Sequence, residues 1–166
     1  MKTKLLGMLW TLMGVFVLTS CSDDDDDILA SEVPTAVMNA FESKFPSVHQ
    51  AEWELNKGYY VAEFWQSNIE TKAWYDAKAA WKMTEFDYGK DLQSLPAPVR
   101  KAFMESKYSG WWLDDVCKYE RTDLTFYFIQ VGEKGQKDRN LYYKEDGTLL
   151  KEEPDRDYEL TPDTKI

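Results

Sequence analysis

The sequence has few of the side chains and motifs on which enzymes depend. It contains a single histidine, His49, and two cysteines, Cys21 and Cys117. The G-x-S-x-G, H-E-x-x-H and Gly-rich phosphate-binding patterns are missing. A Cys117–His49 pair is formally available, but Cys117 in a strand pattern is typical of a small buried hydrophobe. The neighbouring Asp114 and Asp115 would point to opposite faces of a strand. We therefore expect no enzymatic activity and keep a hydrolase as the alternative.

Acidic side chains outnumber basic ones. The chain has 20 Lys and Arg against 30 Asp and Glu, which gives a formal net charge of −10. A surface of this charge repels nucleic-acid phosphates and anionic lipid headgroups. We expect no nucleic-acid partner, no metal and no cofactor.

The apolar run from Leu5 to Leu18 is short of the about 20 residues that a spanning helix needs. Two lysines precede it, and it ends in Leu18-Thr19-Ser20-Cys21, which resembles the bacterial lipobox. Residues 1–20 are therefore predicted to be a lipoprotein signal peptide and Cys21 to carry the lipid that anchors the chain to a membrane. A plain secretory signal is the alternative. With Cys21 lipidated, Cys117 has no cysteine to pair with.

An acidic run, Asp23 to Asp27, follows Cys21 directly. Adjacent carboxylates repel one another, so residues 21–30 are predicted to be a solvated tether. The run also resembles the acidic export signal of surface lipoproteins in some Gram-negative bacteria. Calcium binding is a third interpretation, although consecutive Asp residues lack the alternating ligands of a calcium loop. We expect a bacterial outer-membrane lipoprotein of the cell envelope, either periplasm-facing or surface-exposed.

One stretch of the chain occurs twice, as Val33 to Phe45 and as Leu95 to Tyr108. Pro, Val, Ala, Phe, Glu, Ser and Lys recur in the same order in both copies. In the first copy Val33, Val37 and Phe41 fall on one helical face. Each copy is therefore predicted to be a helix with one apolar stripe to bury.

Strand-like segments follow each helix. Alternating apolar residues and turn residues predict strands at 48–55, 59–65, 69–76, 80–86, 113–120, 124–131, 140–144 and 148–151. Their short connections require antiparallel pairing. The predicted fold is α+β: a tandem αββββ repeat over 31–90 and 91–153, with both helices on one face of one antiparallel sheet. The charged segment 154–166 is predicted to be a flexible tail.

The repeat alignment also indicates which strand residues face away from the helices. Glu63 and Gln130 occupy equivalent positions and are unsuited to the helix side. Their phase carries an aromatic set to the open face, which is the predicted partner-binding site: Tyr59, Val61, Trp65, Trp74, Phe126, Phe128 and Tyr142. An exposed aromatic face is typical of a contact surface. The alternative is that a third layer, a loop or the C-terminal tail covers it.

The motifs in both repeats resemble one known family. They are Leu/Val-Pro-x-x-Val-x-x-Ala-Phe, then Glu52-Trp53-Glu54, Gly58 to Phe64, and Tyr75-Asp76 separated by four residues from Trp81. Over about residues 31–153 this pattern resembles the PepSY-like lipoproteins, which are similar in fold to the β-lactamase inhibitor protein. The resemblance implies one curved sheet with helices on its back, a periplasmic or surface location, and binding or inhibition of proteins. It implies no catalytic residue.

The two repeats differ at one pair of equivalent positions within that family pattern. Gly147 keeps the glycine that is usual in the Tyr-Asp hairpin, whereas Ala79 replaces it. The first hairpin is therefore expected to have a different turn.

The function expected from this sequence is that of a non-enzymatic lipoprotein that binds or inhibits a secreted or envelope protein. Its site would be the open sheet face. The alternative is a surface glycan-binding accessory protein, in which Trp65 and Trp74 stack on sugar rings.

Overall fold

The computed structural model describes residues 25–156 and 159–166. Nine strands form one antiparallel sheet in which each strand pairs with its neighbour in sequence. The strands are β1 (Asp25–Ile28), β2 (Glu52–Asn56), β3 (Tyr59–Gln66), β4 (Ile69–Tyr75), β5 (Trp81–Asp87), β6 (Trp112–Arg121), β7 (Thr125–Gly132), β8 (Arg139–Tyr143) and β9 (Leu149–Pro154). The helices are α1 (Thr35–Lys44) and α2 (Ala97–Met104), and the 3-10 turns η1 (Ala30–Glu32) and η2 (Leu92–Ser94) precede them. The predicted α+β fold is confirmed.

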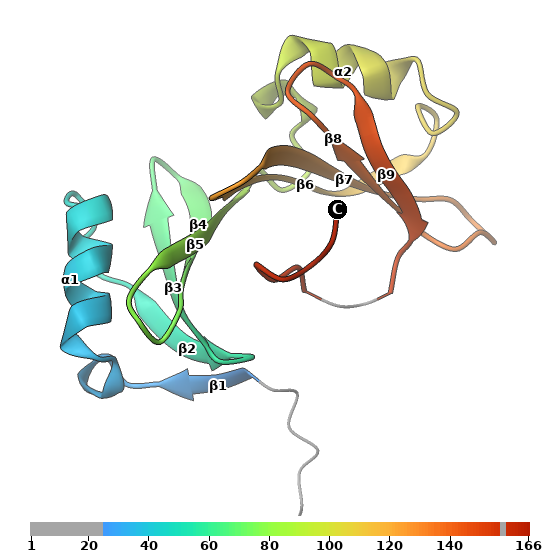
Figure 1. The fold of residues 1–166 in the computed structure, drawn as a ribbon. Helices are drawn as coiled ribbons and strands as arrows, with labels where there is room; N and C mark the ends of the chain where they lie inside the picture. The colour runs from blue at the N-terminus through green and yellow to red at the C-terminus, as the bar shows by residue number, and fades with distance from the viewer. Residues whose placement is uncertain (1–24, 157–158) are drawn as a thin grey trace, which may run out of the picture.

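Both helices lie on the convex side of the curved sheet (Figure 1). The predicted apolar stripe of α1 is buried, with Val37 and Phe41 packed against Trp53, Phe64 and Tyr75. Helix α2 does the same in the second half, where Val99 and Phe103 are buried over β6, β7 and β8. Each repeat therefore has its own helix-side core, because each helix has one apolar face to remove from water.

The sheet is continuous across the junction of the two halves. Strand β5 pairs with β6 from Met83↔Arg121 to Asp87↔Cys117. A third cluster, on the concave side, contains residues of both halves, among them Trp74, Met83, Phe126 and Tyr142. The register thus joins the halves through backbone hydrogen bonds and through shared side-chain packing.

The acidic segment differs from its prediction. Residues 25–28, expected in a solvated tether, form β1 and pair with β2 from Asp25↔Asn56 to Ile28↔Trp53. A strand needs only backbone N–H and C=O groups for its ladder, so the side chains of Asp26 and Asp27 remain exposed while the chain is paired. Residues 1–24, which include the predicted signal peptide and Cys21, lie outside the described part of the chain.

The C-terminal segment also differs from its prediction. Residues 159–166 were expected to belong to a flexible tail, but they pack inside the curve of the sheet (Figure 1). Leu160 is 6% exposed and joins the concave cluster, with Ile166 packed against it. The apolar side chains of this otherwise polar segment bind it to the sheet.

Within residues 25–156 and 159–166, no helix combines the length and hydrophobicity that crossing a membrane requires.

Candidate functional site: the concave face of the sheet

The seven residues predicted as a site share the concave face. Val61 lies directly opposite Trp74, and Phe128 lies directly opposite Tyr142, so each pair projects to the same side. Strand alternation then places Tyr59 and Trp65 on the side of Val61. The phase derived from the repeat therefore identifies one side of the sheet.

Five of these residues are nevertheless not available as a surface. Val61, Trp74 and Tyr142 are 0% exposed, Phe126 is 1% exposed and Phe128 is 7% exposed. The expectation of an open aromatic face is wrong at these positions, because the C-terminal segment and the curvature of the sheet bury them. Tyr59 is half-buried, and Trp65 is 67% exposed.

The segment that covers them, residues 159–166, is called here the C-terminal strap. Glu159 is its main polar anchor: one carboxylate oxygen accepts from Asn56 Nδ2 at 2.6 Å, and the other accepts from Lys72 Nζ at 2.9 Å. Asp163 accepts from the Tyr59 hydroxyl at 2.9 Å. Arg121 donates to the backbone oxygen of Thr164 at 2.7 Å. These bonds come from β2, β3, β4 and β6, so the strap crosses much of the sheet.

A pocket of about 290 Å³ opens beside the strap. Its walls are Glu85, Asp115, Tyr119, Phe128, Gln130, Asn140, Asp155, Glu159 and Leu160, and it is called here the strap pocket. Four of these side chains are carboxylic acids, and two are aromatic. The sequence analysis missed this site, although Glu85 has the same strand phase as Met83 and so shares its face.

The strap pocket contains buried acidic groups whose pKa values are raised. Burial raises the pKa of Glu85 to about 8, and the nearby Lys72 opposes that shift. Burial also raises the pKa of Asp115, while a hydrogen bond from the Cys117 thiol lowers it. Two buried acceptors, Glu85 Oε2 and Asn140 Oδ1, have no hydrogen-bond partner among the described residues. An unpaired buried acceptor costs about 1–3 kcal/mol, so both atoms favour a ligand that donates.

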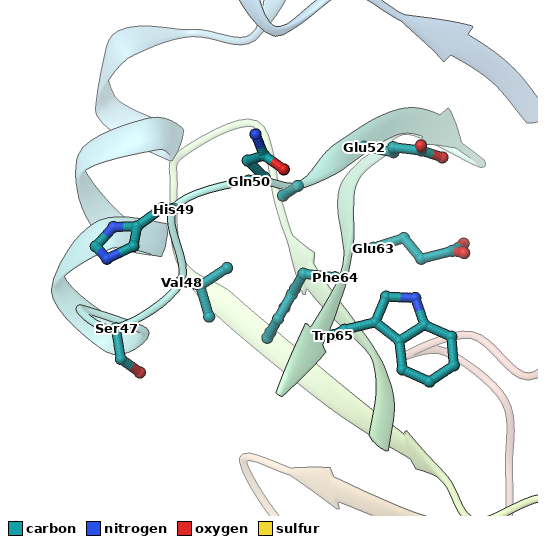
Figure 2. A pocket seen from close by; sticks show the side chains of 9 residues that line it. Ser47, Val48, His49, Gln50, Glu52, Glu63, Phe64 and Trp65 are labelled. Carbon is teal, nitrogen blue, oxygen red and sulfur yellow. The ribbon is translucent and has the colours of Figure 1, made fainter. Parts of the chain in front are cut away.

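A second hollow, of about 750 Å³, lies where the chain enters β2 (Figure 2). Glu52, Glu63 and Trp65 project to one side of β2 and β3, and Val48 and Phe64 lie between the strands and the loop. Glu52 lies directly opposite Glu63 in the register. This hollow, lined by 47–52 and 63–65, is called here the Trp65 hollow.

Like charges also face each other on the neighbouring strands. Glu70 of β4 lies directly opposite Asp87 of β5. A hydrogen bond with Glu63 is the largest cause that raises the pKa of Glu70, followed by burial and by repulsion from Glu63 and Asp87. Directly opposed like charges destabilise a sheet. The concave face therefore carries an acidic region next to its exposed tryptophan.

The two residues of the formal catalytic pair have different environments. Cys117 is buried on the concave face, and burial together with Glu85 and Asp115 raises the pKa of its thiol well above the usual value. His49 is exposed on the loop before β2, beside the Trp65 hollow. A protonated, enclosed thiol is a poor nucleophile, so this arrangement gives no support to a Cys/His mechanism.

One group of side chains has the spacing of metal ligands. Single ligand atoms of Asp87, Asp115 and Cys117 lie within 4.8 Å of one another. The thiol donates to Asp115 Oδ2 at 3.3 Å, and Gly89 N donates to Asp87 Oδ1 at 2.5 Å. These hydrogen bonds engage the thiol and one oxygen of each carboxylate.

Comparisons with known proteins agree with the fold. A family described as "Putative beta-lactamase-inhibitor-like, PepSY-like" matches residues 58–151. No curated protein matches the chain. A BLIP-like protein from Bacteroides fragilis NCTC 9343 is 32% identical, with a TM-score of 0.73, over 79% of this chain and 94% of that one.

Two further solved structures are similar. A DUF2874 family protein from Bacteroides ovatus ATCC 8483 is 28% identical, with a TM-score of 0.69, over 73% of this chain and 86% of that one. A protein from Bacteroides eggerthii DSM 20697, described as one of the "putative periplasmic proteins", is 27% identical, with a TM-score of 0.69, over 74% and 88%. The sequence match over 58–151 and the shared architecture together show that the chain belongs to the PepSY-like, beta-lactamase-inhibitor-like family.

Proposed function

We propose that this chain is a non-enzymatic binding module of the bacterial cell envelope, which binds or inhibits a protein partner through the concave side of its sheet. The observation that carries the proposal is Trp65, a large aromatic side chain that is 67% exposed at the edge of a hollow. Exposed aromatics of this kind dominate the affinity of protein interfaces. The likeness to a BLIP-like protein supports a protein partner in general.

The proposed contact surface is narrower than the seven-residue set. It comprises Trp65, Glu52 and Glu63 at the Trp65 hollow, and it extends to Tyr59 beside the strap. The buried members Val61, Trp74, Phe126, Phe128 and Tyr142 support this surface from below and become accessible only if the strap moves. Trp65 is therefore the residue that a partner would contact first.

The proposed location is the outer membrane, to which the chain would be anchored as a lipoprotein through Cys21. A Bacteroides relative described as periplasmic supports the envelope location, and the lipobox-like site supports the anchor. Cys21→Ala should move the chain from the membrane fraction to the soluble fraction. Membrane binding that is unchanged in the variant would refute the anchor.

Partner binding is tested by capture from envelope extract with the full chain, followed by affinity measurement with the captured protein. Trp65→Ala should weaken binding by more than about 1 kcal/mol if Trp65 is central. Trp112→Ala is the matched control, because Trp112 is a second tryptophan with a largely exposed side chain, at 48%, outside the hollow. Equal affinities of the two variants would remove Trp65 from the interface.

Glycan capture loses one of its two supports. It was expected to use Trp65 and Trp74 as a pair of stacking rings, but Trp74 is fully buried. A single exposed ring beside Glu52 and Glu63 fits a protein contact better than a sugar platform. Binding of the full chain to a glycan panel, with Trp65→Ala as the control, would separate the two.

A further inference from the structure

We propose that the strap pocket receives one positively charged side chain, lysine or arginine, of the protein partner. The inference rests on the proposed function and adds the chemistry that the partner must present. Its basis is the pair of buried acceptors Glu85 Oε2 and Asn140 Oδ1, which line the same pocket and lack hydrogen-bond partners among the described residues.

The two acceptors are held in place by their neighbours. Asn140 is 7% exposed, and its Nδ2 donates to Asp155 Oδ1 at 3.0 Å, which leaves its Oδ1 as the acceptor. Glu85 lies on β5 directly opposite Lys72 on one side and Tyr119 on the other, and its carboxyl has side-chain hydrogen bonds with Tyr119 and, at Oε1, with the Cys117 thiol at 3.9 Å. Asn140 lies on β8, with β6 and β7 between it and β5, so the pocket offers an incoming group two separate acceptors.

The walls of the strap pocket select a cation over other donors. Asp115, Asp155 and Glu159 surround Glu85 with further acidic groups, so an anion is repelled. Tyr119 and Phe128 provide aromatic surface, which attracts a cation at its ring faces. Lysine carries three donors and arginine five, and neither side chain has an acceptor that would face these carboxylates.

Size restricts the ligand to a single side chain. A volume of about 290 Å³ is just below the range of about 300–1,000 Å³ usual for small-molecule sites. An apolar side chain would fit by size, but it would leave both buried acceptors unpaired. A calcium ion needs six to eight oxygens at about 2.3–2.6 Å. Among the described His, Cys, Asp and Glu residues, Glu85 does not belong to the group whose ligand atoms converge within 4.8 Å, so a metal fits less well.

Binding of a cation should displace a proton. Because burial raises the pKa of Glu85 to about 8, its carboxyl is largely protonated at pH 7. A lysine or arginine side chain would favour the ionised form, as a neighbouring opposite charge does. Proton release on binding is thus a signature that an ordinary surface contact would not produce.

The test uses the full chain, isotope-labelled for NMR, with N-acetyl-lysine methylamide and N-acetyl-arginine methylamide as probes. N-acetyl-norleucine methylamide is the uncharged control, and calcium and zinc chloride form a separate arm. We expect saturable shifts of the Glu85, Asp115 and Asn140 amides with at least one charged probe. Calorimetry at pH 7 in buffers of different ionisation enthalpy should show proton release.

Glu85→Gln should weaken binding of the charged probe about tenfold or more and abolish the proton release. Glu145→Gln, on the exposed β8–β9 turn, is the matched control and should change neither. Absence of saturable binding, equal binding of the norleucine probe, or saturation by a metal without binding of the charged probes would overturn the inference.

Measurements of partner binding distinguish this inference from the proposed function. If Trp65→Ala weakens partner binding but Glu85→Gln does not, the function stands and the cation pocket is wrong. If charged probes bind the pocket but no protein partner depends on Trp65, the pocket stands as a cation site and the proposed function is wrong.

Discussion

The carboxylate of Glu159 accepts a hydrogen bond from the Lys72 ammonium at 2.9 Å, across 87 residues of sequence. This ion pair joins the last described segment of the chain to β4, near the middle of the first half of the sheet. The same carboxylate reaches Asn56 on β2. Glu159 is thus the main polar link between the strap and the sheet, and both partners of its ion pair with Lys72 are partly shielded from water.

Removal of the strap, by a stop codon in place of Glu159, should destabilise the protein. Burial of a leucine contributes about 1.5–3 kcal/mol, and each hydrogen bond contributes about 1 kcal/mol. The expected loss is therefore about 3 kcal/mol or more in urea denaturation, with a red shift of tryptophan emission as Trp74 is uncovered. Lys165→Ala is the control, because this exposed residue bonds Lys151 through its backbone oxygen alone. An unchanged urea midpoint in the truncated chain would mean that the strap contributes nothing to stability.

Trp74 and Trp65 should respond differently to truncation. Trp74→Ala empties a fully buried site and should cost about 3–5 kcal/mol of unfolding free energy. Trp65→Ala removes an exposed ring and should cost less than about 1 kcal/mol. Denaturant unfolding of both variants checks this pair, and equal losses would contradict the placement of the two rings.

Glu85 should make stability fall as the pH rises. Its pKa is about 8 in the folded chain against 4.5 for a free glutamate, so the folded state binds the proton more tightly. Its contribution is present below pH about 4.5 and is lost as the pH rises toward 8. The charged groups that act on it are Lys72 on β4, Asp115 on β6 and Glu159 on the strap.

Glu85→Gln removes this dependence. Relative to the parent chain, the variant should gain about 1 kcal/mol or more in unfolding free energy at pH 9 compared with pH 5, since one pKa unit corresponds to about 1.4 kcal/mol. Urea denaturation at the two pH values measures the difference. A gain of the same size at both values would show that Glu85 titrates normally.

The equivalent hairpins of the two repeats should tolerate opposite changes. Gly147 has a φ of +85°, and a Cβ on it would lie 2.6 Å from the backbone oxygen of Pro98. Gly147→Ala should therefore cost about 1–3 kcal/mol. Ala79 has a φ of +63° although it carries a Cβ. Ala79→Gly should be neutral or stabilise by up to about 1 kcal/mol, because glycine adopts this conformation without strain. Thermal unfolding tests both, and a stabilising Gly147→Ala would contradict the geometry.

The two repeats, proposed to span 31–90 and 91–153, should unfold together. Strands β5 and β6 pair across their junction, and the concave cluster contains Trp74 from one repeat and Tyr142 from the other. Each half alone is near the size at which a core becomes marginal. Tryptophan fluorescence and far-UV circular dichroism should therefore give one coincident transition, whereas two separate midpoints would indicate independent domains.

The amino-acid sequence by itself determined the helices, most strands and the side of the sheet on which the seven candidate residues lie. The spacing of Val37 and Phe41 indicated the buried stripe of α1, and the phase of Glu63 indicated the concave side for Val61. These are local properties, because the helical period of 3.6 residues and the strand period of 2 residues are set by backbone geometry within a few residues. The repeat strengthened them, since two copies had to satisfy the same geometry.

Only the tertiary structure decided what covers each side. The strand periodicity predicts that Trp74 faces away from α1. The structure adds that Trp74 packs in one buried cluster with Leu160, which is 86 residues further along the chain. The strap was missed because a segment rich in charge and proline resembles a free tail until Lys72 and Asn56 supply partners for Glu159. Glu85 was missed for the same reason, because its elevated pKa arises from burial by neighbouring strands and not from any local pattern. Long-range burial therefore decided the site.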